Sequence, residues 1–113
     1  MENFKFSYDE QNDDLFVYLD GKKSEGAVEM GNFVFDFDKE ENLVAIQISD
    51  ASKVLSKLLS KIINLAKITS IKLEIINFRN MTAVRMFVET SEEKIVAPII
   101  VPRVKQMSPA LNY

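Results

Sequence analysis

Short stretches in which apolar and polar residues alternate most strongly constrain what this chain can fold into. Residues 4–9 read Phe-Lys-Phe-Ser-Tyr-Asp, and residues 33–38 read Phe-Val-Phe-Asp-Phe-Asp. A period of two places successive side chains on opposite faces of a β-strand, so that one face can be buried. A polar turn follows each stretch and leads into an apolar segment, at residues 15–19 and 43–48. The pattern predicts two antiparallel hairpins, with a short extra strand at 27–30.

Residues 50–67 change to a helical period. Their apolar residues recur three and four positions apart, and the lysines form a separate row on another face. Ser49 or Asp50 is expected to cap the first turn, because short polar side chains accept hydrogen bonds from its free N–H groups. No glycine or proline interrupts the segment. The sequence therefore predicts one central amphipathic helix packed on the hairpin sheet.

Three further strands are predicted after the helix, within residues 68–102. Pro98 lies in the last of them and cannot donate to a β-ladder, which predicts that this strand lies at a sheet edge. The order of strands, one helix and more strands is typical of an antiparallel α+β fold. We predict a single domain over residues 1–113, made of the hairpins and helix (1–67), the additional strands (68–102) and a tail (103–113).

The residue types that are missing exclude several kinds of chemistry. The 113 residues include no cysteine and no histidine, which excludes a Ser-His-Asp triad, a cysteine nucleophile and a zinc finger. The three glycines, at 21, 26 and 31, are isolated and form no phosphate-binding loop. We therefore expect a protein that is not an enzyme and needs no cofactor.

Charge is divided unevenly along the chain. Residues 1–50 hold 13 acids and 4 bases, a net charge of -9, whereas residues 51–113 hold 4 acids and 10 bases, a net charge of +6. The two sets can neutralise each other within one fold or across a dimer, so nucleic acid and membrane are not the expected partners. The start of the chain lacks the pattern of a signal peptide, and we expect a cytoplasmic protein.

A more specific pattern occupies the first half of the chain. Residues 8–9 are Tyr-Asp, residues 13–19 contain Asp-x-Leu-x-Val-x-Leu, and residues 49–52 are Ser-Asp-Ala-Ser. Over roughly residues 4–59 the chain resembles the Domain of Unknown Function 2283 family of short prokaryotic proteins. The resemblance implies the hairpin fold and no particular chemistry. Such genes lie beside small toxin-like genes in some cases, which implies an antitoxin-like role with a small protein partner.

Acidic residues gather at the turn of the second hairpin. Asp36, Asp38 and Glu40 alternate along the chain, and Ca²⁺ or Mg²⁺ takes clustered carboxylate oxygens of this kind. The spacing fails the EF-hand pattern, because Glu41 replaces the glycine at the sixth position. The two interpretations are carboxylates on a solvated turn and, as an alternative function of the protein, a divalent-cation site.

Nucleic-acid binding is a second alternative function, and it rests on the lysines of the helix and of nearby residues. Lys53, Lys57, Lys61 and Lys67 could meet the phosphates of a nucleic acid. The chain offers only three arginines to accompany them. The row is equally typical of the solvated face of an amphipathic helix, or of a contact with the acidic hairpins.

Apolar residues on the last two strands indicate an interface. Phe87 falls on the outward phase of its strand, and residues 95–101 are apolar on both faces. A contiguous apolar surface is rarely left exposed by a monomer, so either a helix or the tail of this chain covers it or another chain does. We therefore predict a non-enzymatic protein-interaction module that acts as a homodimer, with an interface formed by Phe87, Ile95, Val96, Ile99, Ile100 and Val101.

Overall fold

Strands make up most of the computed structural model, which describes residues 2–102. All eight strands pair antiparallel in one sheet, in the order β3-β4-β5-β2-β1-β6-β7-β8. The elements are β1 (Glu2–Asp9), β2 (Asp14–Tyr18), β3 (Gly26–Met30), β4 (Phe33–Phe37), β5 (Leu43–Ile48), α1 (Ala51–Leu59), a 3₁₀ turn η1 (Leu65–Lys67), β6 (Ile68–Asn77), β7 (Met81–Thr90) and β8 (Lys94–Pro102).

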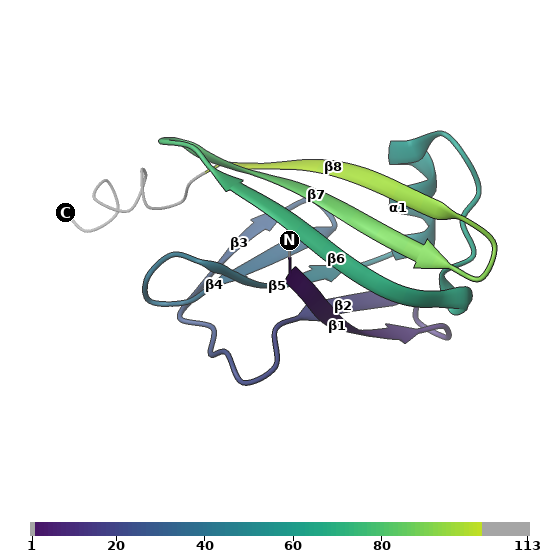
Figure 1. Cartoon of the computed structure of the whole chain (residues 1–113), viewed down its shortest axis with the longest axis horizontal. Helices are drawn as coiled ribbons and strands as arrows, with labels where there is room; N and C mark the ends of the chain where they lie inside the picture. Colours follow the sequence, from purple (N-terminus) through teal and green to yellow (C-terminus); the bar gives the residue numbers. More distant parts are fainter. Residues whose placement is uncertain (1, 103–113) are drawn as a thin grey trace.

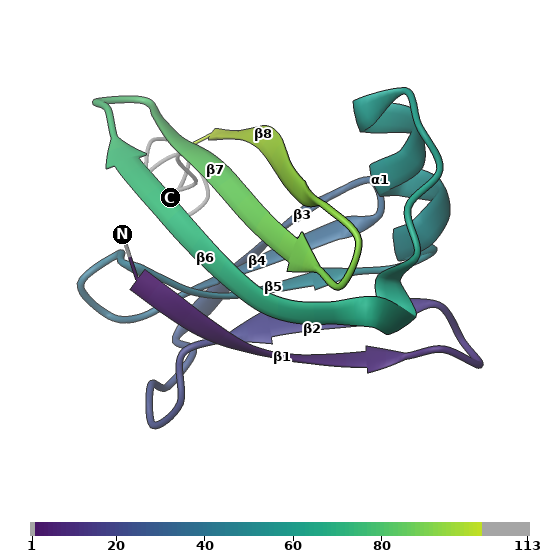
Figure 2. The same cartoon turned by 45° about the vertical axis from the view of Figure 1, so that its right-hand side comes forward.

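The sheet folds on itself because β1 belongs to both of its halves. Residues 5–9 of β1 pair with β2, whereas residues 2–4 pair with β6. The long strands β6–β8 therefore form one wall and β2–β5 the other, with α1 beside the start of β8 (Figures 1 and 2). The result is a curled, half-open barrel.

The core lies between the two walls. Inward-facing side chains of both halves meet there, among them Phe35, Ile46, Leu73 and Met86, each at most 1% exposed. The helix adds only Ala51 and Leu55 to the fully buried set. Most of the apolar surface is thus buried by the sheet against itself, and this burial is the main stabilising contribution.

The strand predictions are confirmed: every predicted strand corresponds to an observed one, although Leu19 and Asp38 lie just beyond the ends of β2 and β4. Within residues 2–102, strand β8 pairs with β7 alone and so lies at the sheet edge that Pro98 predicts. Its burial alternates strictly from Lys94 to Pro102. The predicted tail, residues 103–113, lies outside the described residues.

The predicted α+β architecture with a central helix is wrong. The fold is mainly antiparallel sheet, and its one α-helix spans nine residues instead of the eighteen from 50 to 67. The chain leaves the helix at Ser60, which adopts a left-handed conformation, and Lys61 N–H bonds back to the Ser56 carbonyl. Ile62, expected on the buried face, is 92% exposed.

Among the described residues, no helix has the length and apolar character that a membrane span requires.

Replacing Ser60 by glycine is expected to stabilise the protein by about 0.5–1 kcal/mol, because Ser60 has φ 55° and glycine adopts this region without steric cost. Urea unfolding followed by circular dichroism measures the change. Ser56→Gly, inside the same helix, is the matched control and should destabilise by a similar amount. Destabilisation by Ser60→Gly would contradict the role of this cap.

Candidate functional site

The carboxylates predicted to bind a cation point to different partners. Asp36 is buried, and its oxygens accept hydrogen bonds from the Ser24 hydroxyl (2.9 Å) and the Gln47 amide (3.2 Å). Asp38 instead accepts the backbone N–H groups of Glu40 and Asn42, both at 2.9 Å.

Strand β4 ends at Phe37, so Asp38 lies in the turn that follows and not on the strand face that carries Asp36. The register shift at this point adds one extra residue, Val44, to β5 and not to β4. The side chain of Glu40 is exposed. Within residues 2–102, no three potential ligands of the His, Cys, Asp or Glu types form a metal-binding group. Cation binding by these residues stays a prediction.

Asp13 links the first hairpin to the start of the helix. Its carboxylate accepts the Tyr8 hydroxyl at 2.6 Å, the Ser52 hydroxyl at 2.7 Å and the Ser52 backbone N–H at 3.0 Å. Its carbonyl accepts the N–H of Ala51 at 2.8 Å. Asp50, at the N-cap position, makes no side-chain cap. The predicted cap from Ser49 or Asp50 is therefore wrong, because a residue 39 positions away from Ser52 takes that place.

The hydrogen bonds also set the charge state of this cluster. Burial is the largest influence on Asp13 and by itself would raise the pKa of that carboxyl, but the hydrogen bonds from Tyr8 and Ser52 outweigh it and hold the pKa low. Burial and the hydrogen bond to Asp13 raise the pKa of Tyr8 to about 12. Tyr8 therefore remains a neutral donor and Asp13 a charged acceptor at neutral pH.

Stability is expected to fall in acid through this cluster. Because the pKa of Asp13 is lower in the folded than in the unfolded chain, its stabilisation is complete above about pH 4 and is lost as the pH drops through the folded-state value. Urea unfolding between pH 7 and pH 2.5 measures this dependence. Asp13→Asn should make the free energy of unfolding depend less steeply on pH in this range. Part of the dependence should remain, because the pKa values of Asp9, Asp20 and Asp38 are also lowered. If the free energy of unfolding of Asp13→Asn depended on pH as steeply as that of the original chain, the role given to Asp13 would be contradicted.

The lysine row is partly engaged within the chain. Lys61 pairs with Glu93, and Lys67 pairs with Glu92 at 3.3 Å. Both acids lie in the turn between β7 and β8 and not on the acidic hairpins. Lys53 and Lys57 are exposed on α1.

The structure divides the six predicted interface residues into two groups. Ile95, Ile99 and Val101 face the core and are at most 6% exposed. Val96 and Ile100 face outward, with 44% and 53% of their surface exposed.

The sixth residue, Phe87, is half-buried on the same outward side as Val96 and Ile100. It lies directly beside Val96, with the Arg85 guanidinium 5.4 Å from its ring centre.

Sequence reasoning missed other members of this surface. We define the outer face as the outward-facing side of β6, β7 and β8 together with Phe78. Five of the eight large hydrophobic residues that are exposed in the described part of the chain lie on it: Ile76, Phe78, Met81, Val96 and Ile100. The strand register joins Ile76, Ala83 and Ile100 in one row. The break in alternation at residues 76–78 is the sequence signal that could have indicated it.

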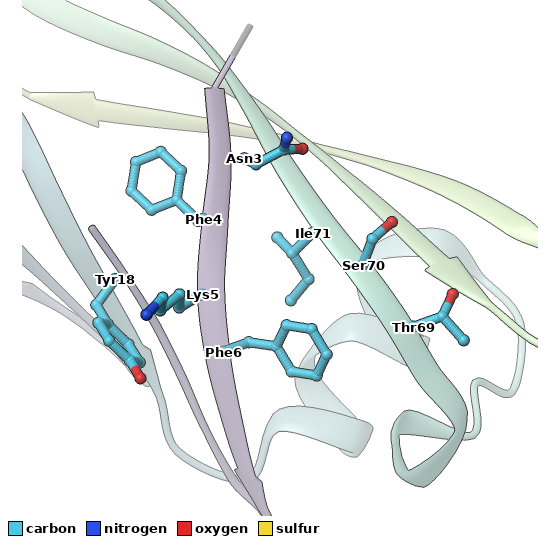
Figure 3. Close-up of a pocket in the computed structure, with 8 residues that line it drawn as sticks. All are labelled: Asn3, Phe4, Lys5, Phe6, Tyr18, Thr69, Ser70 and Ile71. Atoms are coloured by element: carbon cyan, nitrogen blue, oxygen red, sulfur yellow. The ribbon is translucent and has the colours of Figure 1, made fainter. Parts of the chain in front are cut away.

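A hollow of about 360 Å³ opens where β1 parts from β6 (Figure 3). The last pair of these strands is Phe4 with Ile71, and a bulge at Thr69 turns β6 away. Figure 3 shows the ring of Phe6 directed across the gap toward Ile71. Of the eight lining residues only Lys5 is charged, and Asp20 binds its ammonium at 2.8 Å. The hollow therefore offers an incoming ligand little free charge.

Comparison with known proteins shows that the first half of the chain is similar to one family. The model of the family described as "Protein of unknown function (DUF2283)" matches residues 5–52. The predicted resemblance is confirmed over this segment. Tyr8 and Asp13 lie near the beginning of this segment and Ser52 at its end, and the three residues meet at the start of α1.

Two curated relatives are similar to this chain. An uncharacterised protein from Methanocaldococcus jannaschii is 38% identical over 52 residues, which cover 46% of this chain and 45% of the relative. A protein from Methanosarcina mazei named putative hypoxanthine phosphoribosyltransferase is 30% identical over 91 residues, which cover 80% of this chain and 61% of the relative. The chain thus spans less than two thirds of either relative. No solved structure matches it.

Proposed function

We propose that this chain is a non-enzymatic protein-interaction module that acts as a homodimer, with two copies meeting through the outer face. The concentration of exposed apolar side chains on this one side of β6–β8 is the observation that carries the proposal. Surfaces of this kind are rare on proteins that act as monomers. A twofold axis would bring the same face of each copy together, which is the commonest closed arrangement.

The distribution of ion pairs favours a second copy as the occupant. The six ion pairs between described residues each join two residues of the same half, either within 1–50 or within 51–113. These six pairs therefore leave the opposite net charges of the two halves in place. The outer face itself carries both signs, for example Lys72 and Glu74 on β6, so a rotated copy can place acid opposite base.

Edge-to-edge pairing of two copies through β8 is an unfavourable way to form the dimer. Pro98 and Pro102 remove two N–H donors from β8, and proline on an edge strand suppresses the addition of another strand. The exposed side chains of Val96 and Ile100 project from the face of the same strand. Association face to face is therefore favoured over a continuous sixteen-strand sheet.

Size-exclusion chromatography with light scattering tests the proposal. We expect twice the chain mass of 12.9 kDa at tens of micromolar protein. The dimer should persist when the salt concentration is raised, because apolar burial is not screened as exposed charges are. A monomeric mass under these conditions would overturn the homodimer and favour the small protein partner that the resemblance implies.

A further inference from the structure

A pocket of about 390 Å³ lies on the other wall of the sheet, away from the outer face. The register places Tyr18 beside Ala45 and Ala45 beside Asp36, across β2, β5 and β4. Since neighbouring strands lie about 4.8 Å apart, roughly 10 Å separates the two outer backbones. The small side chain of Ala45 leaves space between them, with the Gln47 amide beside it at 3.2 Å from Asp36, and residues of the loop after β2 line one end.

Asp36 forms one wall of this pocket. Only 9% of the residue is exposed, and no ion pair to it occurs among the described residues. Ser24 and Gln47 each donate one hydrogen bond, one to each carboxylate oxygen. Each oxygen retains a further lone pair, because a carboxylate offers about four acceptor positions. A buried carboxylate without an opposite charge is costly, so a cationic donor would be strongly favoured.

Two aromatic rings form the opposite wall. Phe16 and Tyr18 stack with their ring centres 4.9 Å apart and their planes at 17°. Phe16 is 38% exposed, so part of its ring is available to a ligand. Aromatic faces attract cations, and planar guanidinium groups in particular stack on them while donating paired hydrogen bonds to a carboxylate.

The other carboxylate at the pocket already has a partner, since Asp20 is bound by Lys5 at 2.8 Å. Lys22 also lines the pocket, but its side chain is exposed and makes no ion pair with another described residue. The negative charge of Asp36 is therefore the one left for a ligand.

We propose that this pocket binds a planar guanidinium group, carried by a free alkylguanidine or by an arginine side chain. The cation lies above Ala45, donates to the Asp36 carboxylate and stacks against Tyr18 and Phe16. This activity is separate from self-association, because its residues belong to β2, β4 and β5 and not to the outer face.

Titration of the full chain with methylguanidinium chloride, followed by NMR, tests the proposal. We expect saturable shifts of the Gln47 side-chain amide and of the Phe16 and Tyr18 rings. Methylurea, the neutral analogue, should bind at least about tenfold more weakly, because it lacks the charge that Asp36 attracts. Equal binding of methylurea, or no saturable shift with methylguanidinium, would overturn the proposal. Tighter binding of acetyl-arginine amide than of methylguanidinium would identify an arginine side chain as the source.

Three variants locate the site. Asp36→Asn keeps the shape of the side chain and should weaken binding at least about tenfold. Ala45→Leu keeps the charge but fills the pocket, and should abolish binding. Glu29→Gln, an exposed carboxylate on β3, is the matched control and should bind as the original chain does. Undiminished binding in folded Asp36→Asn or Ala45→Leu would refute the site, and so would Ca²⁺ alone shifting the same signals at lower concentration.

Discussion

Replacing Asp13 by alanine is expected to lower the free energy of unfolding by about 3 kcal/mol. The change removes the acceptor for the Tyr8 hydroxyl and for the Ser52 hydroxyl and N–H. Loss of a helix cap costs about 1–2 kcal/mol, and a hydrogen bond to a charged group contributes about 1.5–3 kcal/mol, with incomplete additivity. Alanine also tolerates the φ of 56° at this position poorly, at about 1 kcal/mol.

Urea unfolding at pH 7 measures this effect, and two variants separate its causes. Asp13→Asn retains an acceptor and a residue that adopts the left-handed region, so it should lose less than half as much stability. Asp14→Ala removes the neighbouring, exposed aspartate and should change stability by under about 0.5 kcal/mol. Equal losses in Asp13→Ala and Asp14→Ala would mean that the link to the helix contributes nothing.

Replacing Ile100 by aspartate is expected to abolish the proposed self-association through the outer face. Ile100 lies in the row with Ala83 and Ile76, and in the proposed dimer a carboxylate there would be buried against the second copy. A buried charge without a partner costs several kcal/mol, so the dissociation constant should rise by at least about 100-fold. Light scattering across a dilution series measures this change.

Ile62→Asp provides a matched control for the interface. Ile62 is even more exposed than Ile100, at 92% against 53%, but it follows the helix and lies away from the outer face. The midpoint temperature of thermal unfolding should be the same for both variants and the original chain when they are compared in the same oligomeric state. The reason is that neither side chain belongs to the core. A dimer that survives Ile100→Asp and dissociates in Ile62→Asp would move the interface to the end of the helix.

The strands could be predicted because their signal is local. In β8 the apolar residues and Pro98 indicated an edge strand before any partner was known, and the structure places it beside β7 alone. The helix was predicted too long for a physical reason. Residues 60–67 continue the helical spacing, but Ser60 takes a left-handed conformation. Ile63 then reaches the core from irregular backbone and Leu65 from the 3₁₀ turn η1. Periodicity alone cannot distinguish these two ways of burying the same residues.

The candidate sites depended more on tertiary structure. Asp36 and Asp38 alternate in the sequence, but β4 ends between them and their carboxylates accept hydrogen bonds from different partners. Asp13 was visible only as part of a family pattern, because its contact with Ser52 spans 39 positions. The pocket above Ala45 needs three strands from different parts of the first half to lie side by side. No pattern within a single segment of the sequence indicates which strands will lie side by side.

The sequence by itself determined which segments become strands, where turns separate them, which chemistry the missing histidine and cysteine exclude, and which half resembles a known family. Tertiary structure alone decided that β1 serves both walls of the sheet, that Asp13 caps the helix, and which side of β8 remains exposed. The reason is that side-chain alternation follows from residue order within a strand. The identity of a strand's neighbour depends instead on how the whole chain buries its apolar surface.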